Sequence, residues 1–157
     1  MNSVFGRQEF QVLPVEVYAV EVAEVRVAGF AAIRLEVFVG EQHVPPDEEM
    51  DDLDATAIHV LASVDGQPIG TGRLIVVDAE NARIGRMAVR KTHRGTGVGA
   101  AILDRLVDEA RSRGIRTLTL SGQLHAIPFY ERFGFVAHGD VYLDAGIEHR
   151  TMERPVD

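Results

Sequence analysis

The stretch RMAVRKTHRGTGVGAAILDRLVDEA, residues 86–110, places a strand pattern, a glycine-rich loop and an amphipathic helix in direct succession. Residues 83–90 alternate as a strand does, and apolar residues then recur at helical spacing: Val98, Ile102, Leu103, Leu106, Val107 and Ala110. Gly114 stands where this helix is expected to end. The loop before it holds Gly95, Gly97 and Gly99. We therefore expect free backbone N–H groups at a helix N-terminus, where the helix dipole favours an anion.

The distribution of charge supports an anionic ligand at this loop. The chain has a formal net charge of −8, which argues against general nucleic-acid binding. The segment from Asn81 to Leu103 nevertheless contains no acid, and it carries the cations Arg83, Arg86, Arg90, Lys91 and Arg94 together with His93. An acidic protein thus keeps one cationic stretch, and the glycines lie inside it.

The remaining patterns predict the elements around this stretch. We expect a strand over 15–22, a helix over 24–39 with Phe30, Ile33, Val37 and Phe38 on one face, a polar acidic loop over 41–54, an antiparallel hairpin over 57–64 and 68–77, a strand over 115–120, a helix over 127–133 and a final hairpin around DAG at 144–146. A helical crossover makes strand 115–120 parallel to strand 83–90.

This order predicts an α+β fold with a mixed, mostly antiparallel central sheet flanked by helices and closed by a C-terminal β-hairpin. The length of 157 residues suits one domain over 1–157, with residues 1–14 as a loosely attached extension. The start lacks a signal-peptide pattern, and we expect a cytoplasmic protein that binds no membrane.

Composition excludes several kinds of chemistry. The chain has no cysteine, which removes disulfides, thiolate metal sites and an acyl-cysteine intermediate. We expect no metal, because the six histidines, His43, His59, His93, His125, His138 and His149, show no paired ligand spacing. The acidic run DEEMDDLD, residues 47–54, lacks the central glycine of a calcium loop.

The glycine loop admits several interpretations. Gly95, Gly97 and Ala100 satisfy the G-x-G-x-x-A pattern of dinucleotide-binding folds, but antiparallel strands precede it and no ribose-binding acid follows. A Walker loop fails, because no Lys-Ser or Lys-Thr follows the glycines. A glycine-rich turn that binds nothing is the remaining structural alternative.

At these residues the sequence resembles the GCN5-related N-acetyltransferase (GNAT) family. RGTGVGA is similar to the family's R/Q-x-x-G-x-G/A signature, and AIPFYERFGF, residues 126–135, resembles its Tyr-x-x-x-Gly-Phe segment. The features similar to the ElaA-like branch are Arg34, Val37, Phe38, Glu41, Gln42 and the segment DVYLDAGIEHRTM at 140–152. The resemblance covers about residues 15–154.

The resemblance implies an acetyl-CoA-dependent N-acetyltransferase that transfers acetyl directly to an amine, on a small molecule by our interpretation. It assigns the pantetheine arm and the oxyanion to the backbone of Met87, Ala88 and Val89. It assigns the pyrophosphate to the loop residues Arg94, Gly95, Thr96, Gly97, Val98, Gly99 and Ala100. It assigns Tyr130 as the catalytic residue that protonates the leaving thiolate.

Several roles stay open at this stage. Candidate bases are Glu41, His43, His59 and the acids of 47–54, and none stands out. For His125, which replaces a frequent family asparagine, we expect a capping role. The acids Asp51, Asp52 and Asp54 are interpreted as a solvated loop, or else as groups that attract a cationic amine.

Two other function classes remain as alternatives. A non-catalytic acyl-CoA-binding or interaction module would keep the loop without a productive acceptor site. A nucleotide-binding oxidoreductase ranks lower, because the ribose acid is missing. The oligomeric state is open, with a homodimer as one option.

Overall fold

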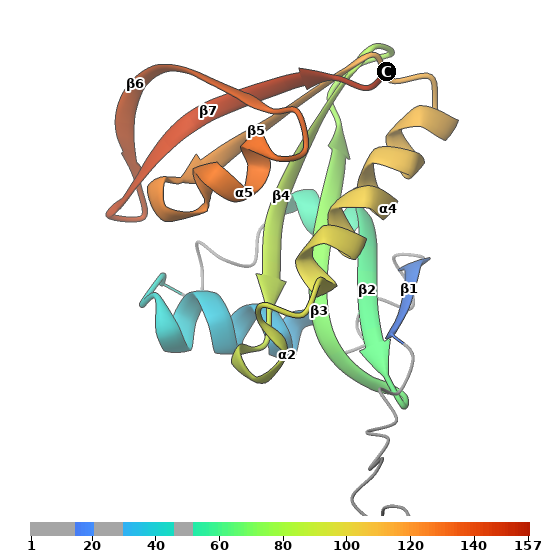
Figure 1. The fold of residues 1–157 in the computed structure, drawn as a ribbon, viewed down its shortest axis with the longest axis vertical. Coiled ribbons are helices and arrows are strands. Elements are labelled where there is room, and N and C mark those ends of the chain that lie inside the picture. The colour runs from blue at the N-terminus through green and yellow to red at the C-terminus, as the bar shows by residue number, and fades with distance from the viewer. Residues whose placement is uncertain (1–14, 21–29, 46–51) are drawn as a thin grey trace, which may run out of the picture.

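The computed structural model describes residues 15–20, 30–45 and 52–157. They contain one seven-stranded sheet in the order β1-β2-β3-β4-β5-β7-β6 (Figure 1). Its strands are β1 Val15–Val20, β2 Ile58–Val64, β3 Gln67–Val76, β4 Asn81–Val89, β5 Thr117–Gln123, β6 Val136–Asp144 and β7 Ile147–Pro155. The main helices are α2 Phe30–Arg34, which continues as the π-helix η1 Leu35–Glu41, then α4 Val98–Ser112 and α5 Ile127–Glu131.

The parallel pair β4 and β5 stays together over a short distance only. Residues Asn81–Ile84 pair with Thr117–Leu120, whereas the other neighbouring strands pair antiparallel. Beyond Ile84, β4 remains paired with β3, while β5 remains paired with β7 up to Gln123. Figure 1 shows the two strands side by side at one end and diverging toward the other.

A β-bulge in β4 accompanies this divergence. Arg73 of β3 lies opposite Gly85, but Thr71 lies opposite Ala88, so β4 holds one residue more than β3 in this interval. The extra length is taken up at Arg86, whose φ of 52° is unusual for a residue with a side chain. Bulges bend the strand that carries them and increase its twist. The bulge therefore turns the second half of β4 away from β5.

The helix α4 packs directly on the backbone of β3. Gly70 and Gly72 share the α4 face of the strand, and a Cβ at Gly70 would lie 2.7 Å from Ile102 Cδ1. A Cβ at Gly72 would lie 2.9 Å from Leu106 Cδ1 and 2.8 Å from Met87 Sδ. Only glycine leaves room for so close an approach. The helix is thereby seated over the strands, and its N-terminus lies next to the end of β4.

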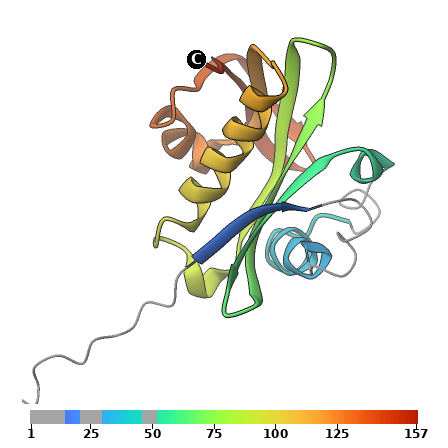
Figure 2. The same cartoon turned by 90° about the vertical axis from the view of Figure 1, so that its right-hand side faces the viewer.

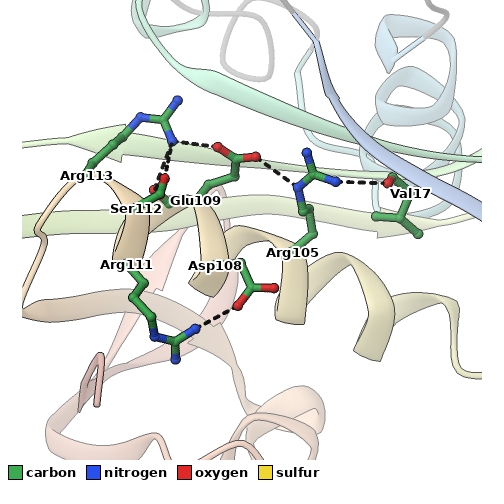
Figure 3. A network of polar contacts seen from close by, with 7 residues as sticks. All are labelled: Val17, Arg105, Asp108, Glu109, Arg111, Ser112 and Arg113. Carbon is green, nitrogen blue, oxygen red and sulfur yellow. Dashed lines mark hydrogen bonds and ion pairs between the residues drawn. The ribbon is translucent and has the colours of Figure 1, made fainter.

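The solvent face of α4 carries a row of ion pairs (Figure 3). Arg105 Nε donates to Glu109 at 2.9 Å, and its Nη1 donates to the carbonyl oxygen of Val17 in β1 at 3.2 Å. Arg113 donates to the same Glu109 carboxylate at 2.6 Å. Ion pairs between residues four apart on a helix each contribute about 0.3–0.5 kcal/mol. Their main structural effect is that Arg105 ties an edge strand to the helix.

The helix α2 and its π-helical continuation cover the opposite face of the sheet (Figure 2). Ile33, Val37 and Phe38 are buried there in a second, smaller core that includes Leu61 of β2. The π-helix ends at Glu41, and its C-cap residue Gln42 donates its amide to the carbonyl of Val37 at 3.1 Å. The two helical layers thus enclose the sheet from both sides.

A buried charge network anchors this second layer. The Asp54 carboxylate accepts hydrogen bonds from Arg34 at 2.7 and 3.2 Å and from Arg73 at 2.9 Å. His59 Nε2 lies 3.0 Å from the Asp54 carbonyl oxygen. Both arginines are almost fully buried. Burial alone would raise the pKa of Asp54, but the two guanidinium groups outweigh it and hold that pKa below its ordinary value.

The predicted order of elements and fold class are confirmed, with local corrections. The first helix was predicted over 24–39; its residues 24–29 lie outside the described residues, and the helix extends to Glu41 in π-helical form. β5 extends to Gln123 rather than ending at residue 120, and α5 ends at Glu131 rather than at residue 133. The interpretation of the acids as a solvated loop is wrong for Asp54, whose side chain is only 14% exposed.

The predicted domain organisation and the predicted cytoplasmic location both stay predictions. The single domain with a loosely attached segment 1–14 is untested, because residues 1–14 lie outside the described residues. Within the described part of the chain, no helix is long and apolar enough to cross a membrane.

The contact between α4 and β3 predicts a cost for any side chain at Gly72. We expect Gly72→Ala to lower the free energy of unfolding by about 1–3 kcal/mol, because the fully buried Ile102 and Leu106, and Met87 beside them, would have to shift to make room. Urea denaturation measures this. Gly85→Ala in the adjacent strand is the matched control, because a Cβ there meets nothing within 4 Å. Equal stability of both variants would contradict the close packing.

The charge network predicts a pH-dependent effect of Asp54→Asn. At neutral pH we expect a loss of about 3 kcal/mol, because Arg34 and Arg73 each lose one buried counter-charge. The folded-state pKa of Asp54 is lowered, so its contribution is complete above the unfolded pKa of about 3.9 and is lost as the pH falls through the folded value. Denaturation at several pH values should therefore show a constant difference from wild type down to about pH 5.

The exposed pair Asp108–Arg111 supplies the control for that experiment. Asp108 is 63% exposed, and Asp108→Asn should change stability by less than about 0.5 kcal/mol. If Asp54→Asn were equally mild at neutral pH, the network would have no anchoring role.

Candidate active site

The divergence of β4 and β5 opens a cleft of about 560 Å³. One wall is the bulged half of β4, and the other is formed by β5 and the residues that follow it. η1 contributes Val37 and Phe38 from one face of the sheet. Tyr130 of α5 comes from the other face. The cleft therefore passes through a gap in the sheet and is lined from both of its sides.

The β4 wall offers backbone groups to a ligand. Met87, Ala88 and Val89, which the family resemblance assigned to the pantetheine arm, line the cleft. The amide of Arg90 donates to Ile69 of β3 at 2.8 Å. Because the backbone groups of successive residues point to opposite edges of a strand, those of Val89 point to the open side. An extended ligand could pair with this edge as an additional strand does.

The glycine loop follows directly at the end of this wall. Gly95 and Gly97 have φ values of 76° and 89°, and a Cβ on either would meet nothing within 4 Å. Gly97 is the N-cap of α4, and no side chain caps the helix there. The first amides of α4 are thus left for an external acceptor. Arg94 lines the cleft, whereas the loop residues 95–100 lie beyond its lining.

The acid-free cationic stretch receives its counter-charges from η1. Arg94 forms an ion pair with Glu41 at 2.8 Å, and its Nε donates to the Val89 carbonyl at 2.8 Å. Arg90 Nε lies 3.3 Å from Glu36. These acids come from a segment about 50 residues earlier in the chain, so the local sequence did not reveal them. The loop is consequently less positive than its own sequence indicates.

Tyr130 is buried at the cleft, only 9% exposed, with its ring edge-on to Phe129 and Phe135. Among the described residues, none forms a hydrogen bond with its hydroxyl. Burial raises the pKa of Tyr130 to about 12. The phenol therefore stays protonated at physiological pH and can donate a hydrogen bond into the cleft.

His149 lines the cleft from β7 and was missed as a candidate base. It is 7% exposed, its ring is stacked on Tyr142 with centroids 6.0 Å apart, and its Nδ1 lies 2.6 Å from the Ile147 carbonyl oxygen. Only the pairing of β7 with β5, which sets His149 opposite Gln123, brings it to the gap. Sequence spacing contains no signal for this placement.

The other candidate bases lie elsewhere. Glu41 is occupied by Arg94, and neither Glu41 nor His43 lines the cleft. His59 is buried beside Asp54, and desolvation lowers its pKa. The acids 47–51 lie outside the described residues. His125 does line the cleft and is exposed, and it sits in a short 3₁₀ turn, Leu124–Ala126, before α5.

Two further observations complete the site. Gln42 at the end of η1 exchanges hydrogen bonds with Gln123 at 2.8 and 3.3 Å, which joins η1 to β5. The described residues contain no group of three or more histidines and acids placed to hold a metal ion.

Comparisons with known proteins agree with this arrangement. A sequence model of the acetyltransferase (GNAT) domain matches residues 17–155. The Bacillus subtilis protein named uncharacterized N-acetyltransferase YjcF is 38% identical over 121 residues, which cover 76% of this chain and 86% of that protein. The crystal structure of an acyl-CoA N-acyltransferase from Pseudomonas aeruginosa has a TM-score of 0.79 at 31% identity and covers 90% of this chain and 99% of its own.

A third comparison concerns the ElaA-like branch of the family. The crystal structure of Escherichia coli ElaA has a TM-score of 0.80 at 26% identity and covers 90% of this chain and 99% of its own. The family match spans nearly all of the described sheet, from β1 to the end of β7. The chain therefore belongs to the GNAT family of acetyltransferases, with ElaA among its relatives, and is an enzyme of the N-acetyltransferase type.

Proposed function

We propose that the enzyme transfers the acetyl group of acetyl-CoA directly to an amine nitrogen of a small molecule. The observation that carries this proposal is the gap between β4 and β5, where an open strand edge adjoins the uncapped N-terminus of α4. A cleft of about 560 Å³ is in the range of small-molecule sites. The names of YjcF and of the Pseudomonas protein support the same reaction class.

The diphosphate of the donor binds the loop amides of residues 95–100. Positive φ at Gly95 and Gly97 turns the backbone there, and the absence of side chains lets the anion approach it. Arg94 adds a cation at the rim of the cleft. The pantetheine arm then extends along Met87, Ala88 and Val89 and pairs with the open edge of β4.

The thioester carbonyl lies against the same edge. The Val89 amide points into the gap and donates to the oxygen that becomes negative when the amine attacks. A fixed donor in a partly desolvated cleft stabilises this charge without reorganisation. The acetyl carbon forms a bond to nitrogen, and its bond to sulfur breaks.

Tyr130 stabilises the departing sulfur. Burial raises the pKa of Tyr130 to about 12, so its phenol is a weaker acid than an ordinary thiol. The phenol therefore acts chiefly as a hydrogen-bond donor to the thiolate, and the proton lost by the nitrogen neutralises the sulfur through solvent. This refines the proton-donor role expected from the sequence.

Substitution at Gly97 tests the donor site. We expect Gly97→Leu to raise the dissociation constant of acetyl-CoA about tenfold or more, because the side chain would project into the space in front of the loop amides; this corresponds to about 1.4 kcal/mol. Calorimetric titration measures it. Gly66→Leu is the matched control, because Gly66 has a similar φ of 74° and open space at a turn remote from the cleft.

The same titration separates the ligand classes. Wild type should bind acetyl-CoA, and NAD at the same concentration should not displace it. Equal weakening by both leucine variants would attribute the effect to backbone strain, and displacement by NAD would favour a dinucleotide site instead.

Removal of the Tyr130 hydroxyl tests the chemical step. We expect Tyr130→Phe to lower kcat about 10- to 100-fold, because a hydrogen bond to a charged group contributes about 1.5–3 kcal/mol. The dissociation constant of acetyl-CoA should change little. Tyr18→Phe, which removes a phenol bonded to Ser63 in the distant β1–β2 pair, is the control. An unchanged kcat in Tyr130→Phe would overturn the assignment.

A further inference from the structure

The proposed transfer leaves one proton without an acceptor. An alkylamine is an ammonium ion at neutral pH and must lose a proton before it can attack the thioester. Among the titratable groups in the described lining of the cleft, apart from arginines, are Tyr130, His125, Asp144 and His149. Tyr130 is protonated, and His125 and Asp144 are exposed side chains. His149 alone of these four is both buried and able to accept a proton.

We propose that His149 is the general base that removes the proton from the acceptor's ammonium group. This inference rests on the proposed acetyl transfer and assigns the base for it.

The hydrogen bond of His149 decides which nitrogen is free to act. A carbonyl oxygen only accepts, so the 2.6 Å contact with Ile147 requires Nδ1 to carry the proton. In a neutral ring Nε2 is then the unprotonated nitrogen. No described residue bonds to Nε2. The backbone thus holds the imidazole in the tautomer that a base needs.

The ring is also held in orientation by its neighbours. Tyr142, opposite His149 in the β6–β7 pair, stacks on the imidazole with an angle of 20° between the rings. The Tyr142 hydroxyl is hydrogen-bonded to Ser121 of β5, which lines the cleft. A ring fixed from its edge and its face needs no reorganisation before it takes a proton.

His149 and Tyr130 lie on opposite faces of the sheet. Ile147, two residues earlier, packs on the core beneath η1, and Gln123, the cross-strand partner of His149, bonds to Gln42. His149 therefore lies on the η1 face, whereas Tyr130 belongs to the core on the α4 face. Tyr130 thus acts on the leaving sulfur from one side of the gap, and His149 acts on the incoming nitrogen from the other.

The reaction balances with these groups. Nε2 takes one proton from the ammonium ion, and the neutral nitrogen attacks the thioester carbon. The C–N bond forms and the C–S bond breaks. The second nitrogen proton leaves as the amide forms, the thiolate takes up one proton, and His149 returns its proton to solvent.

Nuclear magnetic resonance of the histidine rings tests the tautomer independently of any acceptor. We expect neutral His149 in mildly alkaline solution to carry its proton on Nδ1, and its Nε2 signal to shift when acetyl-CoA is added. His149→Asn identifies the signals. A proton on Nε2 would overturn the proposal, whatever the activity.

The kinetic test varies the basicity of the acceptor at nearly constant shape. Phenethylamine is largely charged in mildly alkaline solution, whereas its analogue with two fluorines on the benzylic carbon is largely neutral and needs no base to free its lone pair for attack. His149→Asn keeps a side-chain N–H donor but has no basic nitrogen. We expect it to lower kcat/KM about 100-fold or more for phenethylamine and less than about threefold for the analogue.

The control and the outcomes separate the two proposals. His138→Asn, at an exposed position of β6 outside the cleft lining, should leave both acceptors unaffected. Equal losses for both acceptors in His149→Asn, or none, would overturn the base assignment while acetyl transfer stands. A wild type that acetylates neither these nor a wider panel of amines would overturn the proposed transfer, and the base assignment with it.

Discussion

β4 and β5 are hydrogen-bonded over four residues each and then part, and the chemistry of the protein depends on this interruption. If the two strands continued side by side, β5 would satisfy the backbone of Val89 and the gap would not exist. A bare strand edge inside a protein is costly unless its groups find partners. Arg94 satisfies the Val89 carbonyl, which leaves the adjacent amide for a ligand. The site is thus built on a strand edge of β4 that no neighbouring strand among the described residues pairs with.

Two packing features keep the interruption in place. The bulge at Arg86 bends β4, and the close seating of α4 on Gly70 and Gly72 fixes the helix over the bent strand. Because the N-terminus of α4 follows β4 after a short loop, the anion-binding amides and the strand edge have a fixed relation. A donor with a phosphate end and an extended arm can use both at once.

The parts of this arrangement that local patterns encode were predictable. The periodicity from Val98 to Ala110 defines α4, and the DG and DAG turns define the two hairpins. The bulge was not predictable, because it is a property of the register between β3 and β4. Asp54 looked solvated because its partners Arg34 and Arg73 are 20 and 19 residues away. His149 reaches the cleft only because β7 pairs with β5, and no local spacing in the sequence specifies that pairing.

The two walls of the cleft are joined by neighbouring residues at the end of η1. Glu41 holds Arg94 beside β4, and Gln42 holds Gln123 on β5. π-helical turns occur frequently at functional sites, and here the turn presents both side chains across the gap. The ion pair is weak, because Arg94 and Glu41 are 41% and 33% exposed. A bound diphosphate can therefore compete for Arg94, whereas the Gln42–Gln123 contact is uncharged and does not compete for the anion. Donor binding would then release one contact between η1 and the β4 side, while Glu36 still holds Arg90 and Gln42 still holds Gln123.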